Sequence, residues 1–458
     1  MADSVEVSPP AASASGRATT TLVLGILSIL CCQFLGPVAW YLGNQELKAI
    51  ASGASPASGE GVTKAGKILG KSYGKAYINF GEPIVLQDYA DQHLSGWRDN
   101  LRSDEEGLPD NFKTFIAKLS LEHSRRVNAA AVANPASLAA LALLASPQRV
   151  VSEEELVEHI GHLIWLLKGE PYSEHLYLPD AAPRSVVEWS APISRIAKLP
   201  HAWGALYGVT TRDAVALTYN RNNIQHLFAV PSLIANLFRT RMLLSDDAVV
   251  MAVRALYPFL RNEFFLRWQP EEVEGVAKSW IKVMLGLGLL TRENDRLRRP
   301  DANSPAYSAL AMLGRVLGET HERYCMTLLL LAEERRSATP LRRERFEEDC
   351  RLLAERMAML TGRDAPEFFD KTLFKGYLNT LIDVGLVTIA ADKTLLVDAR
   401  IERVVERSLE LLSEETRQLL MQMLSRRQQN GEAAAALAPT AAPTEADSDD
   451  VQPPASSP

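Results

Sequence analysis

His175 and Asp180, separated by four residues, have the types and spacing of an acid–base pair. An imidazole oriented by a carboxylate can remove the proton from a hydroxyl group, as acyl transfer to an alcohol requires. The pattern is weak evidence, because a chain with eight histidines is expected to contain about 0.4 such pairs by chance. We therefore interpret His175 and Asp180 as a formal match without a catalytic role.

Two groups of polar residues stand out within apolar stretches. They are Arg221, Asn222 and Asn223, at the start of one predicted helix, and Arg261, Glu263 and Arg267, along another that is rich in Phe and Leu. In the simpler interpretation, the charges pair within the fold and the asparagines cap helix ends. In the alternative, the arginines contact phosphate groups or a neighbouring domain.

Metal chemistry and nucleic-acid binding have little support in the composition. The four cysteines form no Cys or His cluster at zinc spacing, so we expect no metal site, no cofactor and no disulfide framework. The formal net charge is −7, of which five negative charges lie in the last 31 residues. Because the rest of the chain is nearly neutral, we expect no nucleic-acid partner.

A run of 21 uncharged residues extends from Leu22 to Leu42. As a helix it would be about 31 Å long, which matches the hydrocarbon thickness of a bilayer. The sequence thus predicts a transmembrane helix, and Gly36-Pro37 leaves a short hairpin open as an alternative. The lysines that follow favour a single span in the inner membrane with the body in the cytoplasm, and membrane lipid as a partner.

Helical periodicity dominates the remainder of the chain. The uncharged but alanine-rich stretch from Val127 to Gln148 reads as a buried helix. Three segments share an order of apolar helix, polar turn and acidic helix start, beginning near residues 143, 237 and 328. In two places a helix ending at Gly-Leu is followed by a predicted β-hairpin, which favours winged-helix-like subdomains.

The body also resembles a known family. The strings that carry the resemblance are KAYINFGEPIVLQDYADQH, LLASPQRVVSEEEL, YNRNNIQHLFAVPSLIANLF, RALYPFLRNEFFLRW, ETHERY and APEFFDKTLF. In this order they resemble the carboxy-terminal region of bacterial membrane-bound glycerol-3-phosphate acyltransferase. Separately, LVLGILS, GPVAWYLGNQELKAI and GVTKAGKILG resemble a small bacterial membrane domain of unknown function.

The resemblance implies a role in phospholipid biosynthesis, with acyl-CoA or acyl carrier protein thioesters as acyl donors. It implies that Ala76–Ile84 is the last strand of the family's acyltransferase domain. The family's catalytic HxxxxD motif and its arginine blocks precede that strand, whereas the first histidine here is His93. We therefore expect this chain to be truncated before the catalytic motifs.

The predicted fold is mainly α, a helical body of several subdomains with winged-helix-like hairpins and one residual strand, preceded by the transmembrane helix. The predicted regions are a disordered segment (1–18), a membrane segment with a Gly-rich connector (19–70), the helical body (71–427) and a disordered acidic tail (428–458). The leading hypothesis is a membrane-tethered non-catalytic or split-enzyme subunit working beside a separate catalytic domain. The alternatives are an active acyltransferase using unrecognised residues and, more weakly, a winged-helix nucleic-acid binder.

Overall fold

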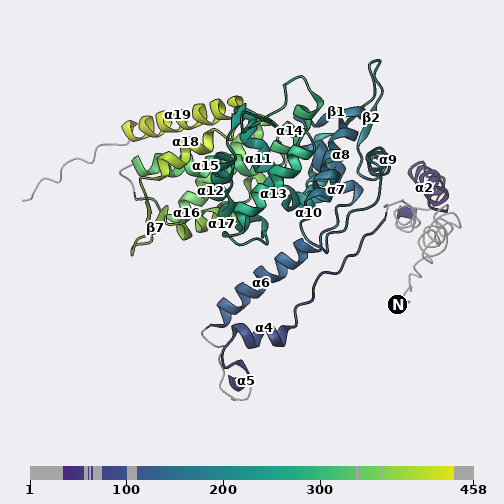
Figure 1. The fold of residues 1–458 in the computed structure, drawn as a ribbon. Helices are drawn as coiled ribbons and strands as arrows, with labels where there is room; N and C mark the ends of the chain where they lie inside the picture. Colours follow the sequence, from purple (N-terminus) through teal and green to yellow (C-terminus); the bar gives the residue numbers. More distant parts are fainter. Residues whose placement is uncertain are drawn as a thin grey trace, which may run out of the picture.

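The computed structural model describes residues 35–55, 60, 63–64, 75–100, 111–336, 340–363 and 365–437. The described part is mainly helical, as predicted, with short strands in small sheets (Figure 1). The predicted disordered segment 1–18 and most of the predicted span lie outside these residues. At the other end, helix α19 (Glu414–Leu437) continues ten residues into the predicted tail, through alanines that favour helix.

The predicted transmembrane helix is wrong. Within the described ranges, no helix is both long enough and apolar enough to cross a membrane. Helix α2 (Leu35–Ala51) begins inside the apolar run, has Pro37 in its first turn and continues through Glu46 and Lys48. Proline lacks a backbone N–H and fits best in the first turn of a helix, which agrees with the position of Pro37 in α2. The first thirteen residues of the run are not described.

The body repeats one topology three times. In each unit a helix leads to a short strand, two further helices and a hairpin. The first unit consists of α7 (Pro135–Leu144), β1 (Val150–Ser152), α8 (Glu153–Gly169), α9 (Pro183–Ile193), β2 (Ala197–Leu199) and β3 (Leu206–Gly208). The second consists of α11 (Ala229–Thr240), β4 (Leu243–Leu244), α12 (Asp246–Phe264), α13 (Val273–Gly286), β5 (Thr291–Glu293) and β6 (Arg296–Arg298).

The third unit contains α15 (Gly318–Arg336), α16 (Arg343–Thr361), α17 (Lys371–Asp383), β7 (Val387–Ile389) and β8 (Leu395–Val397). Its first strand is reduced to a single bridge between Arg342 and Thr394. The sheet orders β1-β3-β2 and β4-β6-β5 place the first strand beside the last, and the bridge repeats this arrangement. The two predicted helix–hairpin segments belong to the second and third units, and the first unit, which was not predicted, has the same winged-helix-like order of helices and strands.

Local sequence signals explain where these elements begin and end. Ser152 and Ser245 cap α8 and α12 by accepting hydrogen bonds from the backbone N–H groups of Glu155 and Ala248, both at 3.2 Å. Gly288 and Gly385 end α13 and α17 with positive φ, which glycine adopts without strain. The chain then turns into the hairpins.

Helices between and after the units join them into one body. The connecting elements are α10 (Thr211–Gln225), η3 (His226–Phe228), α14 (Pro305–Arg315), α18 (Ile401–Leu409) and α19, whereas η2 (Pro147–Arg149) and η4 (Pro366–Phe369) lie within the first and third units. A single hydrophobic core runs from Ala133 to Leu424. The predicted buried helix is α7, which begins at the Asn134 cap with Pro135 in its first turn and is almost entirely buried.

A helical arm projects from the body (Figure 1). It is formed by α4 (Leu86–His93), α5 (Trp97–Asn100) and the long α6 (Phe112–Ala129), and Ala90, Leu94 and Phe115 make its own small core. Before α4, residues 75–85 run in an extended conformation but pair with no strand of the described structure. The segment predicted as a residual strand, Ala76–Ile84, is therefore unpaired within the described chain.

Candidate functional site: an arginine-lined cavity

The structure does not bring His175 and Asp180 together. They lie in an irregular segment between α8 and α9, and no hydrogen bond or ion pair joins them. The backbone of His175 is held by neighbours, since its N–H donates to Ser173 Oγ at 3.1 Å and its carbonyl accepts from Asn79 Nδ2 at 2.6 Å. The carboxylate near the imidazole is that of the adjacent Glu174, at 3.9 Å from Nε2 and thus beyond hydrogen-bond distance, and not that of Asp180.

Three other histidines are buried in the core. Burial lowers the pKa of His159 and of His226 to about 4, and that of His321 to about 3. His159 contacts Ser308 Oγ, His226 contacts the carbonyl of Asn128, and His321 contacts Asn236 Nδ2. All three are neutral at pH 7 and serve as hydrogen-bonding core residues.

Of the predicted polar residues, Arg221 occupies the most informative position. It is buried in the last two turns of α10, and not at a helix start as predicted. Its guanidinium forms ion pairs with Glu319 at 2.9 Å and with Glu367. Asn222 also donates to Glu367, at 3.1 Å, so it supports this ionic group and caps no helix. Asn223 is exposed on the same turn.

The second predicted group is dispersed around α12. Glu263 accepts a bond from Arg323 and pairs with it in the core. Arg261 donates to the carbonyl of Trp268 at 3.0 Å, and Arg267 donates to the carbonyl of Tyr172 at 2.6 Å. These side chains hold the end of α12 and the loop after it. Their arrangement supports a structural role.

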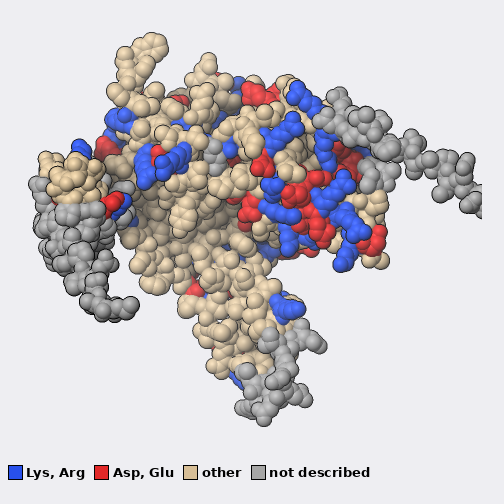
Figure 2. All heavy atoms as spheres, turned by 180° about the vertical axis from the view of Figure 1, so that it is seen from behind, with Lys and Arg blue, Asp and Glu red and all other residues tan. Residues whose placement is uncertain are grey.

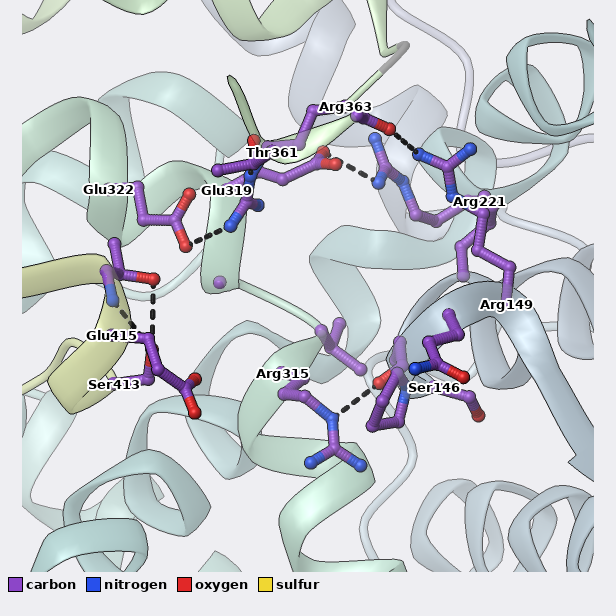
Figure 3. Close-up of a pocket in the computed structure, with 18 of the residues that line it drawn as sticks. Ser146, Arg149, Arg221, Arg315, Glu319, Glu322, Thr361, Arg363, Ser413 and Glu415 are labelled. Carbon is purple, nitrogen blue, oxygen red and sulfur yellow. Dashed lines mark hydrogen bonds and ion pairs between the residues drawn. The ribbon is translucent and has the colours of Figure 1, made fainter. Parts of the chain in front are cut away.

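Arg221 lines a cavity of about 590 Å³ where the three units meet. The wall is assembled from the end of α7 with η2, from α10 and α11, from the α14–α15 junction, from the end of α16 and from the α18–α19 junction. Figure 3 shows side chains from these separate elements directed around a common open space. Within the described residues, five arginines and three glutamates contribute to the wall: Arg149, Arg221, Arg239, Arg315, Arg363, Glu319, Glu322 and Glu415.

Two of the carboxylates are already bonded. Glu319 accepts from Arg221, and Glu322 accepts from Arg363 at 2.6 Å. Arg363 also lies over the ring of Phe368, at 5.3 Å from its centroid. Although Arg363 is close, burial raises the pKa of Glu322 to about 7. One of its oxygens, Oε2, is buried without a partner within the described structure.

Arg239 and Arg315 have no carboxylate within 4 Å in the described part of the chain. Arg315 donates through Nε to the carbonyl of Ala145 at 2.6 Å, and Arg239 donates through Nη1 to Asn236 Oδ1 at 3.2 Å. Burial, and then repulsion from Arg239, lowers the pKa of Arg315 to about 10. The two guanidinium groups are therefore like charges that share a partly dehydrated space.

The loop beside these arginines is strained. Gln148 and Arg149 are consecutive non-glycine residues with φ of 58° and 56°, in the left-handed region. Side chains with a Cβ adopt this conformation at a cost of roughly 1–2 kcal/mol per residue. Arg149 Nη2 donates to the carbonyl of Gly362 at 3.0 Å, which closes the loop against the end of α16. Such strain is concentrated at functional sites.

Sequence reasoning found only Arg221 among the arginines of this cavity. Arg239 and Arg315 lie in the last turns of α11 and α14, where a basic residue is favoured by the helix dipole, so their positions carry no signal of a site in the sequence. Glu319 and Glu322 lie in the string ETHERY, which marks the family resemblance. No sequence spacing connects these residues, because the cavity unites positions from Leu141 to Thr416.

The described structure contains no group of three His, Cys, Asp or Glu side chains placed to share a metal ion. Fold and site together define a helical protein of three winged-helix-like units around an arginine-lined cavity.

Comparison with known proteins identifies the family of this chain. Residues 58–390 match the model of the glycerol-3-phosphate acyltransferase C-terminal region, and the chain belongs to that family.

Curated relatives agree. The chain is 35% identical to a glycerol-3-phosphate acyltransferase of Pseudomonas putida (strain W619) over 329 residues, which cover 70% of this chain and 39% of the relative. It is 35% identical to one from Pseudomonas aeruginosa (strain UCBPP-PA14) over 319 residues, which cover 70% and 38%. The chain thus spans about two fifths of the length of these relatives.

Proposed function

We propose that this chain takes part in the acylation of glycerol 3-phosphate for phospholipid synthesis by supplying the helical body to which an HxxxxD catalytic domain binds. In the reaction, the acyl group moves from a thioester sulfur of acyl-CoA or acyl carrier protein to a glycerol hydroxyl, and the thiol is released. The observation that carries the proposal is the unpaired extended segment at residues 75–85.

This segment has the alternation of a strand. Tyr77 and Asn79 are half-buried against the body, whereas Ile78 and Phe80 are 80% and 86% exposed. Asn79 donates to the carbonyls of Ala130 and His175, which fixes the inner face. Two large apolar side chains therefore point outward from an anchored strand, at the place where the family resemblance puts the end of the acyltransferase sheet.

The described residues favour binding of a separate catalytic domain over catalysis by this chain alone. Its buried histidines are neutral and engaged in the core, and His175 lacks its aspartate. The location at the inner membrane, membrane lipid as a partner, and the identity of the acyl donor stay predictions.

Nucleic-acid binding has one observation in its favour, the winged-helix topology. The third helices of the units, which read DNA in such folds, argue against it, because α9 carries one arginine and one glutamate and α17 carries two lysines and one aspartate. Figure 2 shows basic and acidic side chains intermixed over the part of the body that carries α16 to α19. Such a surface does not provide the continuous basic patch that phosphate backbones require.

Binding of the purified chain to the HxxxxD domain of the Pseudomonas putida relative tests the proposal, measured by isothermal titration calorimetry. We expect Ile78→Asp and Phe80→Asp to weaken association at least roughly tenfold, because each buries a charge at an apolar contact. Met359→Asp on α16, where the methionine is also highly exposed, is the matched control and should bind like the parent. Equal binding by all four proteins would contradict the proposal.

A further inference from the structure

One face of the first unit differs from the corresponding faces of the other two. It is formed by α9 and the β2–β3 hairpin, and we call the side chains of Trp189, Ile193, Leu199 and Trp203 its apolar face. We propose that the apolar face is a second part of the surface that binds the HxxxxD domain. The inference rests on the proposed function and adds to it a separate set of contact residues.

The folded unit leaves these four side chains in solvent. Trp203 is 93% exposed, and the other three are each about half exposed. Trp189 and Ile193 are four residues apart on α9 and therefore lie on one side of that helix. Helix α9 packs against β2, which carries Leu199. Large apolar side chains grouped on neighbouring elements in this way mark an interaction surface.

The tip of the hairpin holds Trp203 in a defined position, and Figure 1 shows this hairpin projecting from the body. The backbone N–H of Trp203 donates to Nδ1 of His201 at 3.2 Å, and the two rings meet edge to face with centroids 5.9 Å apart. Gly204 follows with φ of 110°, a conformation that glycine adopts without strain. The closed turn therefore presents the indole already ordered, which lowers the entropy lost on binding.

The equivalent elements of the other two units are more polar. Helices α13 and α17 expose no large apolar side chain, and lysines such as Lys278 and Lys375 occupy their solvent side. The hairpin tips of the second and third units carry charged residues at positions 294–295 and 392–393, whereas residues 200–205 of the first unit are uncharged. Because the three units share one topology, the fold itself does not require the apolar face.

The apolar face continues the surface of the extended segment at residues 75–85. Lys75, at the start of that segment, lies over the ring of Trp189, with Nζ 5.9 Å from the centroid. Two residues further on, Tyr77 contacts Tyr177 of the first unit, with ring centroids 6.0 Å apart. The segment that carries the two outward-pointing residues therefore begins beside α9, and one partner can contact both surfaces.

The size of a stable interface also requires more than the extended segment. A specific protein–protein interface buries about 800 Å² and about 20–30 residues on each partner. Ile78 and Phe80 are too few to supply this area. The apolar face adds two tryptophans, a residue type that is prominent among those that dominate binding energy.

The charges around the apolar face favour a protein partner over a lipid surface. Lys198 and Arg184 both pair with Glu153 at 2.8 Å, and Arg195 pairs with Asp213 at 3.3 Å. Surfaces that bind anionic lipid carry an excess of basic residues around their apolar side chains. Here the basic residues are matched by carboxylates within the unit, so the face offers apolar contact without a net positive rim.

Calorimetric titration of the full chain with the HxxxxD domain of the Pseudomonas putida relative tests the proposal. We expect Trp203→Ala and Trp189→Ala each to weaken binding at least roughly tenfold, because buried tryptophans contribute strongly to binding. Leu396→Ala is the matched control, since Leu396 is about half exposed on the hairpin of the third unit. If Ile78→Asp weakens binding while both tryptophan variants bind like this control, the inference is overturned and the proposed function stands. Failure of the parent chain to bind overturns both.

Fluorine labels on the tryptophans test the contact without relying on the stability of a variant. The full chain is produced with 5-fluorotryptophan, the signals of Trp203 and Trp189 are assigned with Trp203→Phe and Trp189→Phe, and unlabelled HxxxxD domain is added. We expect these two signals to shift while that of Trp280, which is buried in the core, stays in place. A shift that appears only with vesicles of phosphatidylethanolamine and phosphatidylglycerol, or only as the chain itself is concentrated, would assign the face to lipid or to a second copy and overturn the proposal.

Discussion

Two groups of arginines, both beside α15, differ in whether a carboxylate pairs with them. In the core, Arg323 is paired with Glu263, and their side chains are only 5% and 11% exposed. In the cavity, Arg239 and Arg315 share a space with no carboxylate within 4 Å among the described residues. A pair that is complete within the protein contributes to folding. Arg239 and Arg315, by contrast, are like charges that repel each other.

Breaking the complete pair should have the largest effect. Glu263→Gln leaves the Arg323 guanidinium buried without its counter-ion, which typically costs about 3–5 kcal/mol. Urea unfolding followed by circular dichroism measures the loss. The control is Arg254→Gln, which breaks an exposed ion pair and is expected to cost about 1 kcal/mol or less. If Glu263→Gln lowers the free energy of unfolding by less than this control does, Arg323 is not stabilised by Glu263 as described.

Glu322, in the wall of the cavity, gives the comparison a pH dependence. Its folded pKa of about 7 lies above the ordinary value of 4.5 because burial outweighs the pull of Arg363. The folded state therefore holds this proton more tightly than the unfolded state. Stability should fall by on the order of 3 kcal/mol as the pH rises from about 4.5 to beyond 7.

Glu322→Gln removes the titrating group, so the fall between these pH values should shrink. Unfolding curves of the parent and the variant across this range provide the measurement. Identical pH profiles would mean that Glu322 is ionised in the folded protein throughout the range.

Arg221 is an intermediate case, because its partners Glu319 and Glu367 are half-buried at the cavity wall. Arg221→Gln should cost about 2 kcal/mol, between the core pair and an exposed pair. Thermal unfolding measures it. A loss of stability as large as that of Glu263→Gln would show that Arg221 and its partners behave like the buried Arg323–Glu263 pair.

The smallest effect is expected where two like charges lie together. Arg239→Gln should change stability by no more than about 0.5 kcal/mol, or increase it, because it relieves repulsion from Arg315. The same unfolding assay measures the change. A loss of several kcal/mol would show that Arg239 is a structural charge, and the contrast with Arg323 would disappear.

The sequence predicted the repeated part of the fold well. The capping serines, the Gly-Leu helix ends and the hairpins are local signals, and local signals do not depend on the rest of the chain. Apolarity alone predicts the transmembrane helix, whereas α2 begins at Leu35, has Pro37 in its first turn and contains Glu46 and Lys48. The strand at 76–84 has the right alternation, but a strand needs a partner that the described chain does not provide.

The candidate site was largely beyond sequence reasoning. Arg221 was singled out, but its position near a helix start and the role of the asparagines as caps were wrong. The cavity forms only where the three units pack together. The five arginines come from five segments and lie near one another only in that packed arrangement. The match of His175 with Asp180 shows the converse, because a motif spacing in the sequence produced no contact in space.

The central proposal is that this chain supports acyl transfer as a helical body to which an HxxxxD catalytic domain binds. The direct test is formation of acylated glycerol 3-phosphate from an acyl thioester by the purified chain, by an HxxxxD domain and by their mixture. We predict no turnover by the chain alone and a clear increase for the mixture over the HxxxxD domain, which Ile78→Asp abolishes. Turnover by the chain alone that is lost on substitution of His175 would contradict the account.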